Sequence, residues 1–153
     1  MDLDTLARQF RKFDEVEFAG GVSDQEIDAA AERIGLPIEG GYRAFLRRFG
    51  CGAIEHEEFI GLGGDGHLDV VTVTRDLRAR SLPRAFPSTF IPVLADGYGN
   101  YDCIDTTRRD NGEFPVVAWV HDGDDNPEQL APNYLEWFNR KLQEIRDAME
   151  EDE

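Results

Sequence analysis

Carboxylate side chains are concentrated in two segments of the second half of the chain. Residues 95–106 combine turn glycines, aromatic residues and aspartates, and three of the five residues at 122–126 are aspartates. Carboxylates at this density can bind a cation or the basic surface of another protein. We predict partner-binding roles for six aspartates, although an ordinary turn or strand-edge carboxylate is the simpler interpretation of each one: Asp96, Asp102, Asp105, Asp122, Asp124 and Asp125.

Residues 122–126 also place oxygen ligands at the first, third and fifth positions of a calcium-binding loop. Such a loop needs glycine at its sixth position for a sharp turn, and a bidentate glutamate at its twelfth. This chain has Pro127 and Asn133 there, which excludes an EF-hand. Weak cation binding by the loop stays open, and we predict no cofactor and no dedicated metal site.

No assembled catalytic set is visible elsewhere. Residues 61–66 match the letters of a dinucleotide-binding motif, but that motif needs a helix directly after its glycines. Residues 68–74 instead alternate in the manner of a strand, which favours a glycine-rich hairpin loop. The histidines His56, His67 and His121 lack metal-ligand spacing, and none can be matched with a nucleophile. The sequence therefore predicts a protein that is not an enzyme.

The charge balance indicates the class of partner. The chain has 32 acidic and 16 basic residues, a net charge of −16. Nucleic acids and anionic membranes would be repelled, whereas a basic protein would be attracted and steered. Solubility alone is the other explanation of this charge. No apolar run reaches the roughly 20 residues that span a bilayer, and the acidic N-terminus is unlike a signal peptide, so we predict a cytoplasmic protein.

Helical periodicity is clear at both ends of the chain. Apolar residues at helical spacing predict helices over residues 3–13, over 42–49 and over a C-terminal segment that begins after Asn133. A further helix begins at the capping box of Ser23 and Glu26 and ends at Gly35.

The middle of the chain has the periodicity of strands. The segments predicted as strands are 58–62, 68–74, 90–94, 100–105 and 115–120, with a short helix over 75–81. This order predicts an α+β fold, in which helices pack on an antiparallel or mixed sheet of about five to six strands. We expect a single domain over residues 1–149, followed by a frayed acidic tail at 150–153.

Several segments, taken in order, resemble motifs of the SUKH superfamily, the Smi/Knr-like proteins. Residues 23–27 and 34–37 are similar to its early helix and the stop that follows it. Residues 42–52 resemble its helix ending in two glycines, and 96–105 resemble its turn-and-strand motif. Residues 115–122 and the helix containing Trp137 and Phe138 are similar to the final elements, while 61–90 match no motif securely.

The resemblance implies a function as well as an α+β fold. It implies a non-enzymatic bacterial immunity protein that binds and neutralises a cognate polymorphic toxin. Because the chain is so acidic, the expected toxin is basic, such as a nuclease. The alternative is a general interaction or regulatory adaptor of the Smi/Knr type. No binding residue is transferred from the family, because the face that binds varies with the toxin.

Overall fold

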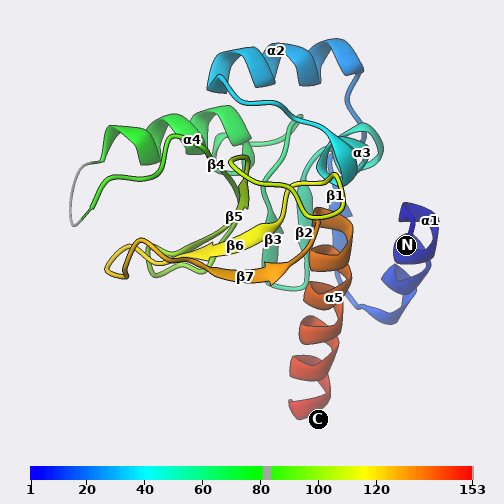
Figure 1. Ribbon diagram of the computed structural model, residues 1–153. Coiled ribbons are helices and arrows are strands. Elements are labelled where there is room, and N and C mark those ends of the chain that lie inside the picture. Colours follow the sequence, from blue (N-terminus) through cyan, green and yellow to red (C-terminus); the bar gives the residue numbers. More distant parts are fainter. Residues whose placement is uncertain (81–83, 153) are drawn as a thin grey trace.

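The computed structural model describes residues 1–80 and 84–152 and has the predicted α+β fold (Figure 1). Its described residues form one antiparallel sheet of seven strands, rather than five or six, in which each strand pairs with its neighbours along the chain. The strands are β1 (Val16–Phe18), β2 (Gly52–Ile54), β3 (Glu57–Phe59), β4 (Phe90–Ala95), β5 (Tyr101–Asp105), β6 (Val116–Trp119) and β7 (Glu128–Ala131).

Helices precede, interrupt and close this meander. The α-helices are α1 (Leu3–Arg8), α2 (Asp24–Ile34), α3 (Gly40–Arg48), α4 (Val70–Ala79) and α5 (Tyr134–Glu151), and the 3-10 helices are η1 (Gln9–Lys12) and η2 (Gly66–Leu68). In Figure 1, α2 and α4 lie near each other in the upper part of the view, and α5 extends downward from the sheet. Among the helices described, none is both long enough and apolar enough to cross a membrane.

The predicted helix boundaries are confirmed where the sequence carries a cap. The hydroxyl of Ser23 accepts the Glu26 amide at 3.2 Å, and the Glu26 side chain reaches back to the amide of Ser23. Gly35 ends α2 in the left-handed conformation, with φ of 73°. Asn133 caps α5 by accepting the Glu136 amide at 2.9 Å. These signals are local, so they could be recognised without the fold.

The strand predicted over residues 68–74 is wrong, because α4 occupies most of that segment. Its β-branched residues favour a strand, yet Asp69 caps a helix by accepting the amide and the hydroxyl of Thr72, each at 2.9 Å. Val70, Thr74 and Leu77 then share the buried face. Tertiary packing therefore overrides propensity. The short helix predicted over 75–81 is the second half of α4, and its end at Ser81 lies outside the described residues.

A helix thus does follow the glycine-rich segment, contrary to the reasoning from sequence. Backbone amides around this segment are nevertheless already hydrogen-bonded within the protein. The Gly61 amide donates to the Leu68 carbonyl, and the Val70 amide donates to the Gly61 carbonyl. The Asp69 carboxylate already fills the N-cap of α4. A phosphate would meet this negative charge instead of free amides. The geometry therefore gives no support to dinucleotide binding.

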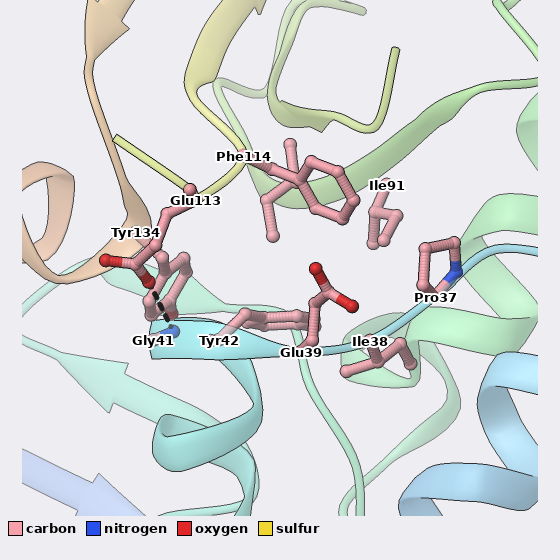
Figure 2. Close-up of a pocket in the computed structure, with 12 residues that line it drawn as sticks. Pro37, Ile38, Glu39, Gly41, Tyr42, Ile91, Glu113, Phe114 and Tyr134 are labelled. Atoms are coloured by element: carbon pink, nitrogen blue, oxygen red, sulfur yellow. Dashed lines mark hydrogen bonds between the residues drawn. The ribbon is translucent and has the colours of Figure 1, made fainter. Parts of the chain in front are cut away.

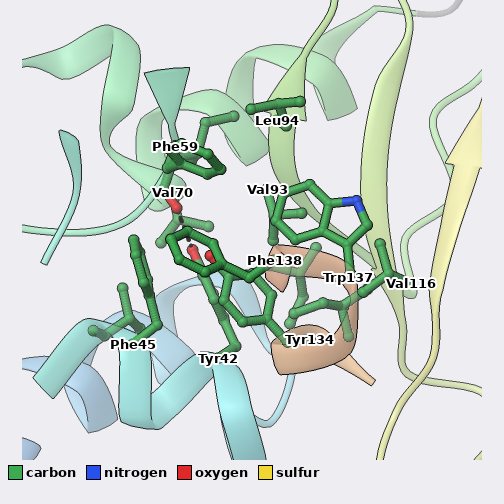
Figure 3. Packing of buried hydrophobic residues seen from close by; sticks show 14 of the residues in the cluster. Tyr42, Phe45, Phe59, Val70, Val93, Leu94, Val116, Tyr134, Trp137 and Phe138 are labelled. Atoms are coloured by element: carbon green, nitrogen blue, oxygen red, sulfur yellow. Dashed lines mark hydrogen bonds between the residues drawn. The ribbon is translucent and has the colours of Figure 1, made fainter. Parts of the chain in front are cut away.

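Both faces of the sheet are covered. The larger hydrophobic cluster includes Ile104 and Val116, while the adjacent Cys103 and Val117 belong to a smaller cluster with Leu77 of α4. Since neighbouring strand residues point to opposite faces, the two clusters lie on opposite sides of the sheet. Figure 3 shows the larger cluster, in which rings from α3 and α5 pack against Phe59 of β3 and its neighbours: Tyr42, Phe45, Tyr134, Trp137 and Phe138.

The short strands β1, β2 and β7 were not predicted. Each has three or four residues, too few for alternation to stand out, and Gly52 and Glu17 are poor strand formers.

At the C-terminal end of the chain, α5 continues through Glu150 and Glu151 to its C-cap Asp152. Glu153 lies outside the described residues. Fraying of this end in solution stays a prediction.

Candidate functional site: an acidic groove

The six predicted aspartates lie in three different surroundings. Asp96 and Asp102 line one hollow beside the sheet, at the end of β4 and on β5. Asp105 lies at the far end of β5, three residues from Asp102 and thus about 10 Å along the strand. Asp122, Asp124 and Asp125 lie in the exposed loop between β6 and β7. Sequence proximity alone therefore does not make them one site.

Asp96 organises the turn from β4 to β5. Its carboxylate accepts the amide of Tyr98 at 2.7 Å and both the amide and the side-chain NH₂ of Asn100, at 3.1 and 2.8 Å. Partial burial opposes the charge, but these hydrogen bonds prevail and lower the pKa of Asp96 below its ordinary value. Asp96 is therefore held as a carboxylate in a fixed position at the rim of the hollow.

Asp102 faces α5. Its Oδ2 accepts the indole N–H of Trp137 at 3.0 Å, and the ammonium of Lys141 lies 3.8 Å away. Burial raises the pKa of Asp102 although Lys141 and Trp137 favour its charged form. Lys141 is also bound by Glu144 at 2.8 Å, so its pKa is raised in spite of its partial burial. This ammonium is already shared between two carboxylates.

Asp105 serves the local structure. It is only 5% exposed, and it accepts the Thr107 amide at 2.9 Å, the Thr107 hydroxyl at 2.6 Å and the Arg108 guanidinium at 3.2 Å. A carboxylate with three internal donors is satisfied within its own loop. Its partner-binding role stays a prediction, and the geometry gives it an evident structural one.

The acidic loop after β6 is tied to Arg84. The guanidinium of Arg84 donates to the carbonyls of Gly123 and Asp124, at 2.8 and 2.6 Å, and approaches the Asp125 carboxylate at 3.5 Å. Asp124 accepts the amide of Asn126 at 2.9 Å. Within residues 1–80 and 84–152, no three His, Cys, Asp or Glu side chains are grouped so as to hold a metal ion. The exposed carboxylates of the loop line neither of the two hollows described next.

A hollow of about 530 Å³ opens where β3 and β4 separate. These two strands are paired only at Phe59 and Leu94, within the part of the sheet that the structure describes. Beyond this pair, side chains from both strands, from the η2–α4 region and from α5 form the walls. The charged residues and histidines among them are His56, Glu57, Glu58, His67, Asp96, Asp102 and Lys141.

A second hollow, of about 420 Å³, runs between the β2–β3 turn and α5. It shares His56, Glu57 and Lys141 with the first hollow, so we treat the two as one acidic groove. Among the described residues of its walls, Lys141 has an ammonium group and eight have carboxylates: Asp14, Glu55, Glu57, Glu58, Asp96, Asp102, Glu144 and Asp152. Six of these eight were not singled out in the sequence, because they are scattered from β1 to the end of α5.

A smaller cavity of about 100 Å³ lies at the N-terminal end of α3 (Figure 2). Its walls are mainly apolar, from Ile38, Ile91 and Phe114. Glu113 accepts the amide of Gly41 at 3.1 Å, so this distant carboxylate satisfies the N-terminus of α3. Glu39 is paired with Arg109 at 2.5 Å. Both carboxylates thus have structural partners, and we assign the cavity to packing.

Two of the three histidines have polar side-chain partners among the described residues. His67 contacts Glu58 at 2.8 Å, and His121 contacts the side chain of Asn100 at 2.8 Å. Neither contact joins a histidine to a serine or cysteine nucleophile, and both cysteines are free and buried. Burial raises the pKa of the Cys51 thiol, which disfavours the reactive thiolate. The acidic walls of the groove attract positive charge.

Comparison with protein families agrees with the fold. A SUKH family model, described as SMI1-KNR4 cell-wall, matches residues 4–143, most of the chain. The chain belongs to the SUKH superfamily. The match runs from α1 into the middle of α5, so the groove wall formed by residues 144–152 lies beyond the matched segment of this SUKH protein.

Proposed function

We propose that this SUKH protein is a non-enzymatic immunity protein that binds and neutralises a cognate basic toxin, with a nuclease as the expected class. The observation that carries the proposal is the acidic groove. Its walls contain eight carboxylates and one ammonium group, and this ammonium is already bound to Glu144. A hollow with this excess of negative charge is complementary to a protein surface rich in lysine and arginine.

The physical basis is competition for the same charges. A nuclease binds phosphates with lysine and arginine side chains, so its substrate-binding face is basic. Carboxylates held in the groove would occupy those cations and exclude the nucleic acid. The overall charge of −16 adds long-range attraction, which speeds association at low salt. The same charge argues against nucleic acid or an anionic membrane as a partner, and the proposed setting is the bacterial cytoplasm.

Co-expression with the product of the neighbouring toxin gene tests this proposal. We expect a stable complex on size-exclusion chromatography and survival of cells that otherwise die from the toxin. A toxin from an unrelated locus is the control and should neither bind nor be neutralised. Absence of both complex and protection with the cognate toxin would contradict the proposal.

A Smi/Knr-type adaptor is the second candidate, favoured by the cell-wall description of the matching family model. The same groove would then bind a basic segment of a regulatory protein. Proximity labelling in the native host separates the two functions. A toxin partner supports the first, whereas recovery of a non-toxin partner through groove contacts supports the adaptor.

A further inference from the structure

One face of α5 forms a continuous wall of the groove. Its residues recur at helical spacing, so their side chains line one stripe along twelve residues, about 16 Å of helix. The residues of this stripe are Lys141, Glu144, Ile145, Ala148, Met149 and Asp152. Figure 1 shows the second half of α5 extending beyond the sheet, away from the other helices.

The stripe has an apolar floor between acidic edges. Ile145 and Met149 pack against the core on one side and line the groove on the other, and the exposed Ala148 lies between them. Asp14, Glu55 and Glu57 form the opposite wall. A surface of this kind fits a segment that is apolar along its centre and cationic along its flanks.

The C-terminal end of α5 is negatively charged, which is unfavourable next to the negative end of the helix dipole. Its last turn contains Glu150 and Glu151 and no basic residue, and Asp152 follows as the C-cap. The carbonyl end of a helix is the negative end of its dipole, where lysine or arginine is stabilising and acidic residues are not. A cationic partner segment alongside this end would supply the missing positive charge.

We infer that the part of the groove along α5 is the docking site for a basic amphipathic helix of the partner protein. The apolar face of this helix lies over Ile145, Ala148 and Met149, and its lysine or arginine side chains reach Glu57, Glu144 and Asp152. A partner helix of about three turns matches the length of the stripe. The inference rests on the proposed function and specifies the segment that the groove recognises.

We expect a helix and not an added strand, because the sheet edge at β1 is charged whereas the stripe on α5 can pack against another helix. The free edge strand β1 has only three residues, one of which is Glu17, and it is preceded by Asp14 and Glu15; a short charged edge of this kind discourages strand addition. The stripe on α5, in contrast, offers side chains at the spacing that a facing helix uses.

Two synthetic 18-residue peptides of identical leucine and lysine composition test the inference. One has leucines on a single helical face, and the other is scrambled so that no face is apolar. Titration by isothermal calorimetry in 150 mM salt suppresses long-range attraction. We expect the amphipathic peptide to bind at least about 10-fold more tightly than the scrambled one. Equal affinities would overturn the inference, because charge alone would then explain binding.

The variant Ala148→Arg locates the site. It places a bulky cation on the floor of the groove, and Ala29→Arg, at an exposed position inside α2, is the matched control. We expect Ala148→Arg to weaken binding of the amphipathic peptide at least about 10-fold, and Ala29→Arg to leave it within about twofold. On the unmodified protein, amide chemical shifts should change over residues 144–152. Equal affinities of the two variants, or shifts confined to other regions, would place the docking site elsewhere.

The cognate toxin separates this inference from the proposed function. If the toxin binds wild type and Ala148→Arg equally well, neutralisation stands and the docking site is wrong. If no toxin binds wild type, but the amphipathic peptide does and Ala148→Arg weakens its binding, the docking site stands and the immunity function fails.

Discussion

The acidic groove and the acidic loop of residues 122–125 lie close together but differ in what surrounds their carboxylates. Asn100, which is held by Asp96 at the groove, accepts the amide of His121 at 3.1 Å and so links the two regions. The groove carboxylates surround two hollows and include the partly buried Asp102. The loop carboxylates point outward, and Arg84 already binds the backbone beneath them.

The comparison shows that density of charge in the sequence is a poor measure of a binding site. The loop has the densest run of aspartates, yet these exposed side chains are screened by water and salt, and they line neither hollow of the groove. The groove collects acidic residues from the segment before β1, the β2–β3 turn, β3, the β4–β5 turn, β5 and the C-terminal half of α5 with its C-cap. Its advantage is geometric, since a concave surface lets several carboxylates act on the same cations.

The largest effect should come from reversing charge in the two regions separately. The variant with Glu57→Lys and Asp152→Lys is expected to weaken binding of the cognate basic partner about 100-fold in 150 mM salt, because like charges would then face each other in the groove. The matched variant with Asp122→Lys and Asp125→Lys should weaken it less than about threefold. Surface plasmon resonance measures both. Equal losses would remove the distinction between groove and loop.

The second effect concerns stability and compares Asp96 with Asp124. Asp96 accepts three hydrogen bonds in its turn, whereas Asp124 accepts one from Asn126. We expect Asp96→Ala to lower the free energy of unfolding by about 1–2 kcal/mol, and Asp124→Ala by less than about 0.5 kcal/mol. Urea denaturation followed by circular dichroism provides the values. A larger loss for Asp124→Ala would show that the loop, not the groove rim, is the more ordered region.

A smaller effect of opposite sign is expected at the end of α5. Glu151→Lys places a cation at the negative end of the helix dipole and four residues after Asp147, so it should raise the free energy of unfolding by about 0.3–1 kcal/mol. Asp122→Lys makes the same change of net charge and is the control. Thermal unfolding at low salt gives the comparison. If the free energy of unfolding rises equally in both variants, the lower net negative charge is the cause and the helix end has no special role.

The smallest effect should be the pH dependence of stability that Asp102 contributes. Burial raises its pKa in the folded protein, so folding is favoured when Asp102 is protonated. This stabilisation is complete below the pKa of the unfolded chain and is lost as pH rises through the higher folded pKa. Asp102→Asn retains an acceptor for Trp137 and cannot ionise. The variant should therefore gain stability relative to wild type as pH rises from about 4 to 7.

Denaturation curves at several pH values, with Asp122→Asn as an exposed control, decide this point. The control should change the pH dependence little, since Asp122 is exposed in its loop. If the difference in free energy of unfolding between Asp102→Asn and wild type stays constant with pH, Lys141 and Trp137 fully offset the effect of burial on the pKa of Asp102.

Much of the fold followed from local chemistry in the sequence. The capping box at Ser23, the left-handed Gly35 and the N-cap at Asn133 predicted helix ends that the structure confirms, because each involves residues within one turn. The strands β4, β5 and β6 were also predicted, since they are long enough to show their pattern. The prediction failed over residues 68–74, where burial against the sheet selects a helix for a β-branched sequence.

The sequence by itself determined the helix caps, the longer strands, the excess of negative charge and the resemblance to the SUKH family. Only the tertiary structure decided which carboxylates share a surface. Asp14 and Asp152 come from near opposite ends of the chain, yet both line the groove, while Asp102 and Asp105 are close in sequence and lie apart. The reason is physical: caps and strands depend on neighbours along the chain, whereas a groove depends on how the sheet and α5 pack.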